Sequence, residues 1–139
     1  MEISVLDAGN YFKGLLLLIR QDHKITGSET TIMMRIGHSL GLEKKFCEEA
    51  IRDILENRYI TDTPPTFSTH KLAMKFLRDG LRIASSADGV NEPEDRWLSA
   101  IVEANGIDAG WYHREKSIVT PMSGDQPFEA DDLHVRYRS

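Results

Sequence analysis

The chain has 139 residues, of which 40% are hydrophobic and 28% are charged, the balance of one ordinary globular domain. Its net charge of −5 argues against nucleic acid or an anionic membrane as the main partner and favours cations or a basic protein surface. The only cysteine is Cys47, so an internal disulfide and a Cys-rich metal site are both excluded.

The first ten residues, MEISVLDAGN, have neither a basic start nor a long apolar run, so we expect no signal peptide. The densest apolar run, residues 15–19, is far too short to cross a bilayer. We therefore expect a cytoplasmic protein with no direct membrane insertion.

Two stretches of the chain share one skeleton, which indicates an internal duplication. RQDHKITGSETTIMMRIGHSLGLE covers residues 20–43, and SADGVNEPEDRWLSAIVEANGID covers residues 86–108. The matched pairs include Gly14 with Gly80, Asp22 with Asp88, Glu29 with Glu94, Ile36 with Ile101, and Gly41 with Gly106. We expect two related helical-hairpin units, about 10–57 and 68–117, arranged about an approximate two-fold axis.

Apolar residues recur at spacings of three and four along most of the chain, which is the period of an α-helix. In chain order, three such stripes are Phe46, Cys47, Ala50, Ile51, Ile54 and Leu55; Leu72, Ala73, Phe76, Leu77, Gly80, Ile83, Ala84 and Ala87; and Trp97, Leu98, Ile101 and Val102. Cys47 is thus predicted to be a small core residue. Because no alternating strand pattern of useful length occurs, the predicted fold is an all-α helical bundle.

Glycine and proline mark the ends of the predicted helices. Gly41 and Gly106 stand where a helix C-terminus needs a left-handed residue, and an apolar residue follows each of them. The segment TDTPPTFST, residues 61–69, separates the two units, and Ser68 or Thr69 can cap the helix that follows.

Residues 1–117 make up the predicted domain, and residues 118–139 make up an irregular C-terminal tail. Pro121, Gly124 and Pro127 interrupt this tail, and no helical stripe forms in it. One interpretation is a flexible or surface-laid tail. The other is that its apolar residues dock onto the body or onto a partner; these residues are Phe128, Leu133, Val135 and Tyr137.

The acids that recur in both units have a local explanation. Thr26-x-x-Glu29 is a capping box, and Asn91-x-x-Glu94 is the asparagine version of one. Asp88 followed by glycine is an ordinary turn pair. Capping and turn formation can thus account for both glutamates and for at least one aspartate.

The two matched aspartates, Asp22 and Asp88, also support a metal-site hypothesis. Each follows an apolar-striped helix near its C-terminus, where the helix dipole disfavours an anion by roughly 0.3–1 kcal/mol. A two-fold arrangement would bring these aspartates together with Glu29 and Glu94. An all-oxygen site of this kind suits Ca²⁺ best, with Mg²⁺ or Mn²⁺ as alternatives. Possible additional ligands are His23, Glu92 and Asp95.

The sequence lacks two of the usual motifs of catalysis. It contains no Gly-x-Gly-x-x-Gly and no Glu-x-x-His, so nucleotide-loop and di-iron chemistry lack their usual motifs. Its one Gly-x-Ser-x-Gly, at residues 37–41, ends at the glycine predicted to close a helix, and no strand is predicted before it, so it lacks the strand-to-helix turn of a hydrolase elbow. His38, His70 and His113 are scattered and are predicted to be surface or structural residues. We therefore expect no enzymatic activity.

The segment GLRIASSADGVNEPEDRWLSAIVEANGIDAGWY, residues 80–112, resembles the tellurite-resistance TerB-like family. The shared pattern is a small-residue helix ending in Ala-Asp-Gly, then a helix bearing a glutamate, then a turn of glycine, an apolar residue and an acid. The resemblance implies an all-helical duplicated core whose acids bind a divalent metal. It carries over Asp88 and Glu94, and also Asp22 and Glu29, with His23 where the family usually has glycine.

Two functional hypotheses follow. The first is a non-catalytic, metal-binding sensor or adaptor of a stress response; the resemblance implies tellurite resistance, and the same module occurs in a membrane-anchored J-domain co-chaperone. The second is a metal-free helical module whose acidic turns are structural and whose acidic face binds a protein partner. Neither hypothesis specifies an oligomeric state.

Overall fold

The computed structural model describes residues 4–21, 27–56, 63–85 and 90–119, and within these ranges the chain forms α-helices and no strand. The helices are α1 (Val5–Arg20), α2 (Gly27–Ser39), α3 (Lys44–Glu56), α4 (His70–Ala84), α5 (Glu92–Ala104) and α6 (Ala109–Ile118). The all-α prediction is confirmed. Residues 120–139 of the predicted tail lie outside the described residues.

Side-chain caps fix the starts of four helices. The capping residues Ser4, Thr69, Asn91 and Asp108 each accept a hydrogen bond from the backbone N–H three residues later, at the beginning of α1, α4, α5 and α6. These bonds satisfy amides that have no partner inside the helix. Of the two cap candidates before α4, the structure uses Thr69.

The two predicted left-handed glycines adopt the same helix-ending geometry. Gly41 has φ 79° after α2, and Gly106 has φ 65° after α5. After α2, Leu42 N–H donates to the Gly37 carbonyl at 2.9 Å, and after α5, Ile107 N–H donates to the Val102 carbonyl at 3.0 Å. Both bonds belong to the Schellman motif, which glycine adopts without a steric penalty.

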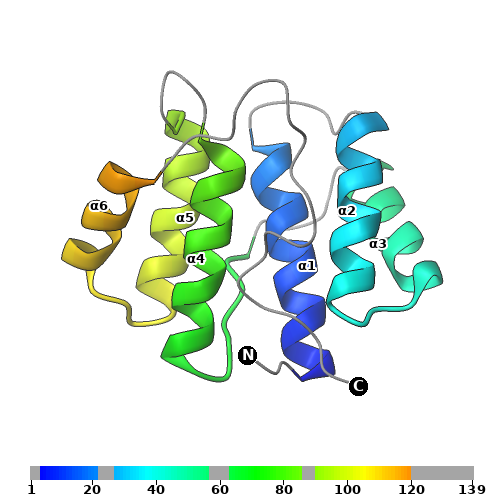
Figure 1. Ribbon diagram of the computed structural model, residues 1–139, viewed down its shortest axis with the longest axis horizontal. Coiled ribbons are helices and arrows are strands. Elements are labelled where there is room, and N and C mark those ends of the chain that lie inside the picture. The colour runs from blue at the N-terminus through cyan, green and yellow to red at the C-terminus, as the bar shows by residue number, and fades with distance from the viewer. Residues whose placement is uncertain (1–3, 22–26, 57–62, 86–89, 120–139) are drawn as a thin grey trace.

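Helices α1 and α4 lie side by side at the centre of the molecule, with α2 and α3 on one side and α5 and α6 on the other (Figure 1). The two central helices run parallel. Near their starts, Ser68 N–H donates to Asp7 Oδ1 at 3.1 Å; near their ends, a Cβ added to Gly80 would lie 3.4 Å from Leu18 Cδ2. Both helices therefore end at the same end of the bundle. The approximate two-fold relation between the units stays a prediction.

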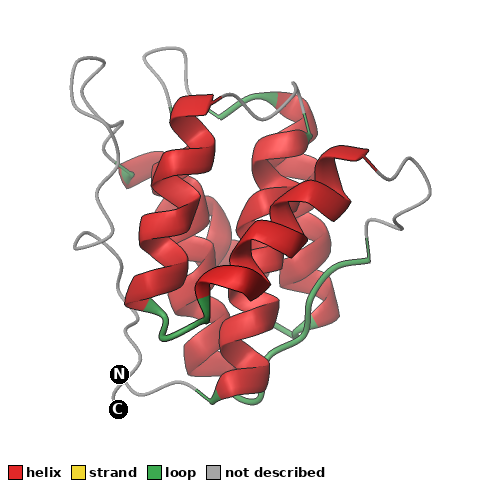
Figure 2. Cartoon of the chain, turned by 90° about the vertical axis from the view of Figure 1, so that its right-hand side faces the viewer, coloured by secondary structure: helices red, strands yellow, loops and turns green. Residues whose placement is uncertain are grey.

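The core fills the space between these helices. Figure 2 shows the same helices from the side, with loops joining them at both ends of the bundle. Where their side chains are described, the residues of all three predicted stripes are buried or half-buried, and Cys47 is among the buried ones. The two halves are also joined by a polar contact, because the Trp97 indole N–H of α5 donates to the Gly14 carbonyl of α1 at 3.2 Å.

A buried hydrogen bond between a tyrosine and a carboxylate joins α1 to α4. Tyr11 Oη donates to Asp79 Oδ2, and both side chains have no exposed surface. Arg82 Nη1 lies 4.0 Å from the other Asp79 oxygen. Burial, followed by the nearby Asp79 carboxylate, raises the pKa of Tyr11 well above 10.0. The phenol is therefore held in its neutral, donating form.

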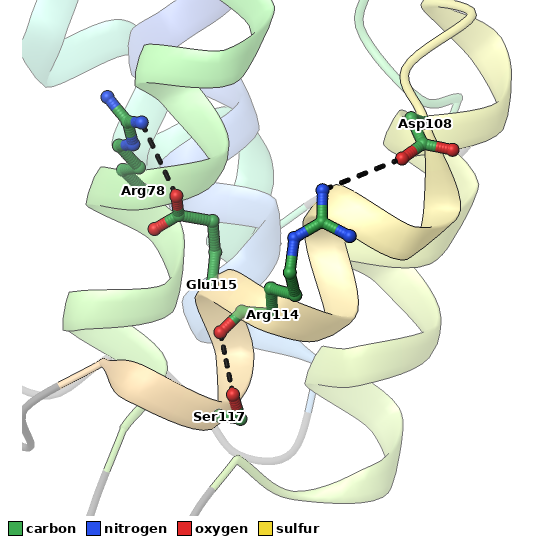
Figure 3. A network of polar contacts seen from close by, with 5 residues as sticks. All are labelled: Arg78, Asp108, Arg114, Glu115 and Ser117. Atoms are coloured by element: carbon green, nitrogen blue, oxygen red, sulfur yellow. Dashed lines mark hydrogen bonds and ion pairs between the residues drawn. The ribbon is translucent and has the colours of Figure 1, made fainter.

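Polar contacts hold α6 in place, and Tyr112 is its only buried residue. Arg78 of α4 forms an ion pair with Glu115 at 3.3 Å, and its guanidinium lies 5.5 Å from the centre of the Trp111 ring. Figure 3 shows this pair beside two contacts close to or within α6: Arg114 with Asp108 at 3.9 Å, and the Ser117 hydroxyl with the Arg114 carbonyl.

We expect Tyr11→Phe to lower the free energy of unfolding by about 1–3 kcal/mol, because Asp79 loses a donor where water cannot replace it. Tyr112→Phe is the matched control, since Tyr112 donates to Asp95, whose side chain is 33% exposed and also contacts Lys116. The Tyr112→Phe control should lose less of its free energy of unfolding than Tyr11→Phe does. Urea denaturation of both variants measures the difference, and equal losses would contradict the role assigned to burial.

We also expect stability to fall at alkaline pH. The folded-state pKa of Tyr11 is raised above the unfolded value of about 10, so the folded chain holds this proton more tightly. The stability that folding gains from this protonated tyrosine is fully present below about pH 10 and is lost as the pH rises above that value. Denaturation midpoints measured between about pH 8 and 11 should fall less steeply in Tyr11→Phe than in the unmodified chain. If the midpoints of the two chains fell equally steeply with pH, the raised pKa of Tyr11 would not be the cause of the alkaline loss of stability.

Candidate functional site

Helices α1 and α4 end, and α2 and α5 begin, at one end of the bundle (Figure 1). Asp22, His23 and Asp88 lie outside the described residues. The backbone of Glu29 belongs to α2, but its side chain is not described. Of the four predicted main ligands, the structure thus describes the side chain of Glu94 alone.

Glu94 is 7% exposed and takes part in the cap of α5. Its backbone N–H donates to Asn91 Oδ1 at 2.9 Å, and Asn91 Nδ2 donates to Glu94 Oε1 at 2.5 Å. The predicted N-cap by Asn91 is therefore confirmed, and the Glu94 carboxylate accepts a hydrogen bond from the same asparagine side chain. This contact fixes the glutamate rotamer at the start of the helix.

The neighbouring acids contact cations of the chain itself. Glu92 is largely exposed and lies 3.9 Å from Arg96 Nη2, one helical turn along. Asp95 Oδ1 accepts from Tyr112 Oη at 2.6 Å and lies 3.3 Å from Lys116 Nζ. Asp95 thus contacts α6, and its carboxylate charge is balanced by a lysine.

A cavity of about 400 Å³ lies beside the start of α5. It is lined by Gln21, Pro64, Pro93, Arg96, Trp97 and Ala100. Gln21 immediately precedes Asp22, and Pro93 immediately precedes Glu94. The C-terminal end of α1 and the N-terminal turn of α5 therefore border the same cavity.

Ser85 is the C-cap residue of α4 and stands three positions before Asp88. Its hydroxyl oxygen is buried and has no hydrogen-bond partner, the only side-chain atom in this state in the described part of the chain. A buried hydroxyl without a partner is costly, so a donor or a cation beside it would stabilise the fold.

Within residues 4–21, 27–56, 63–85 and 90–119, no three His, Cys, Asp and Glu side chains gather closely enough to hold a metal ion. The histidines His38, His70 and His113 are exposed, as predicted. Burial raises the pKa of the Cys47 thiol, which keeps it in its unreactive protonated form.

Sequence reasoning missed two buried acids, Asp7 and Asp79. Asp7 accepts from the Ser4 hydroxyl at 3.0 Å and from the Ser68 hydroxyl at 2.6 Å, so it joins α1 to the segment before α4. The Ser4-x-x-Asp7 spacing was an available signal for its capping role. For Asp79 there was none, because its partner Tyr11 is 68 positions away.

No described helix combines the length and the apolar character needed to cross a membrane. No family model, curated protein or solved structure matches the chain. The TerB-like resemblance therefore rests on the sequence motif alone and stays a prediction.

We expect Asn91→Ala to lower the free energy of unfolding by about 1 kcal/mol in chelator-treated protein, because α5 loses its cap. Asn91→Ser, which keeps a cap oxygen, should restore most of this loss. Asp108→Ala removes the corresponding cap of α6 and serves as a control that shows the effect of losing a cap on another helix. Chemical denaturation measures all three, and an Asn91→Ala variant as stable as the unmodified chain would refute the capping role.

Proposed function

We propose that this protein is a non-catalytic sensor or adaptor that binds a divalent cation at the end of the bundle where α1 and α4 terminate. The ligands in this proposal are carboxylate oxygens of Asp22, Glu29, Asp88 and Glu94. The observation that carries it is the parallel packing of α1 against α4, since two parallel helices must send their following turns to the same end of the molecule.

Three features of the described residues support this placement. The end of α1 and the start of α5 border one cavity. Glu94 is held there with 7% exposure, so its carboxylate is largely removed from water. The buried Ser85 hydroxyl supplies a further oxygen that has no partner among the described residues.

The donor set is all oxygen, which fits Ca²⁺ best and Mg²⁺ or Mn²⁺ as alternatives. A bound cation would offset the repulsion between the carboxylates and the unfavourable helix dipoles at the ends of α1 and α4. By linkage, an excess of cation a hundredfold above Kd would add about 2.7 kcal/mol to the free energy of unfolding. The cation would thereby join the two helical units.

The second candidate function is a metal-free interaction module that binds a protein partner. The Asn91–Glu94 contact favours it, because a capping role alone explains why this glutamate is where it is. Stress response and tellurite resistance, which the TerB-like resemblance implies, remain predictions under either function.

The two functions are separated by titrating chelator-stripped protein with Ca²⁺, then with Mg²⁺ and Mn²⁺. Trp97 lines the cavity beside the start of α5, so its fluorescence should report binding there. We expect a saturable signal and a raised melting temperature. Both should be lost in Asp88→Asn and weakened in Asp22→Asn, whose cation-free forms should be more stable because carboxylate repulsion is relieved.

Glu103→Gln is the matched control, since Glu103 is an exposed acid near the far end of α5. It should respond to Ca²⁺ like the unmodified chain. An unchanged melting temperature up to millimolar cation would reject the metal proposal and leave the interaction module. An equal loss of response in Glu103→Gln would mean that the cation acts through net charge alone.

A further inference from the structure

A second cavity, of about 510 Å³, lies between α1, α3 and the proline-containing segment 63–66. It is formed by described residues of three parts of the chain, and Pro64 lines both this cavity and the cavity beside the start of α5. Its lining residues are Asn10, Lys13, Gly14, Leu17, Ala50, Asp53, Ile54, Thr63, Pro64, Pro65 and Thr66. The volume is within the range of sites that take small ligands.

Hydrogen bonds hold the segment 63–66 and the residues after it against the helices. Asn105, the C-cap residue of α5, donates to the Pro65 carbonyl at 2.9 Å and accepts from Phe67 N–H at 2.9 Å. A Cβ at Gly14 would lie 3.1 Å from Pro65 Cγ, so glycine is what lets this segment approach α1. The cavity wall is therefore preformed, which lowers the entropic cost of binding a ligand.

The cavity has an apolar floor. Leu17 is 7% exposed, and Ala50 and Ile54 are each 5% exposed. Pro64 and Pro65 of the segment 63–66 add apolar ring surface to the lining. This floor suits an apolar group, because covering it removes hydrocarbon from water.

The cavity also carries one exposed cation and one exposed anion, which come from different helices. Lys13 projects from α1, where its ammonium lies 5.5 Å from the centre of the Phe46 ring. Asp53 projects from α3 and forms no ion pair with any described residue. The lining of the cavity therefore includes one positive and one negative side chain in addition to its apolar residues.

We infer that this cavity is a binding site for a small zwitterion with an apolar side chain. The ligand carboxylate contacts Lys13, its ammonium contacts Asp53, and its apolar side chain lies on Leu17 and Ile54. Free apolar amino acids and short apolar peptides share this chemistry. The inference does not rest on the proposed cation site, because Glu94, the one proposed ligand whose side chain is described, is not among the lining residues of this cavity.

The first test titrates the full ¹⁵N-labelled chain with L-leucine and with leucyl-leucine, followed by NMR. The expected result is saturable shifts confined to the lining residues, and the tighter of the two probes identifies the ligand source. N-acetyl-leucine lacks the ammonium and leucinamide lacks the carboxylate. Each should bind at least about tenfold more weakly than leucine, since each loses one charge contact.

The second test uses the variants Asp53→Asn and Lys13→Gln, which change exposed positions and should leave the melting temperature unchanged. Each should weaken binding by about tenfold. Glu49→Gln and Lys45→Gln are the matched controls, because both residues are exposed on α3 outside the cavity. They should bind like the unmodified chain.

Absence of saturable shifts up to millimolar ligand would overturn the inference. Equal affinity for leucine, its amide and its acetyl form would also overturn it, because the charges would then play no part. So would binding by Asp53→Asn and Lys13→Gln at the strength of the two control variants.

Discussion

The parallel contact between α1 and α4 is the constraint on which the rest of the structure depends. A Cβ at Gly14 of α1 would lie 2.8 Å from the Phe76 ring of α4, so glycine at this position lets the central helices approach closely. At the same interface, the fully buried Tyr11 hydroxyl donates a hydrogen bond to the fully buried Asp79 carboxylate. Close packing and a buried polar pair together fix the direction and the register of the two helices. The flanking helices and the ends where the turns emerge are positioned by this one contact.

Local features of this fold could be predicted from the sequence. The glycines Gly41 and Gly106, the Thr69 cap and the Asn91–Glu94 cap each depend on residues within a few positions of one another. Apolar stripes at helical spacing indicated most of the core for the same reason. The bond between Tyr11 and Asp79 could not be predicted, because an aspartate inside a helical pattern resembles a surface residue until its distant partner is known.

The candidate site follows the same division between local and long-range information. The capping contact of Glu94 was predictable because its partner is three residues away. The contact of Asp95 with Tyr112 and Lys116 was not, since it depends on how α6 packs against α5. The cavity between α1, α3 and the segment 63–66 had no signal in the sequence. Lys13 and Asp53 are 40 positions apart, and only the fold makes them neighbours of one cavity.

Helices α3 and α6 are attached to the core in different ways, and this gives the bundle a gradient of local stability. Helix α3 buries Cys47, Ala50, Ile51 and Ile54, whereas α6 buries Tyr112 alone and depends on ion pairs that are partly exposed. Partly exposed ion pairs contribute little and weaken with salt. Separate opening of α6 should therefore cost less free energy than separate opening of α3, and the bundle can release this edge helix while the α1–α4 centre stays folded.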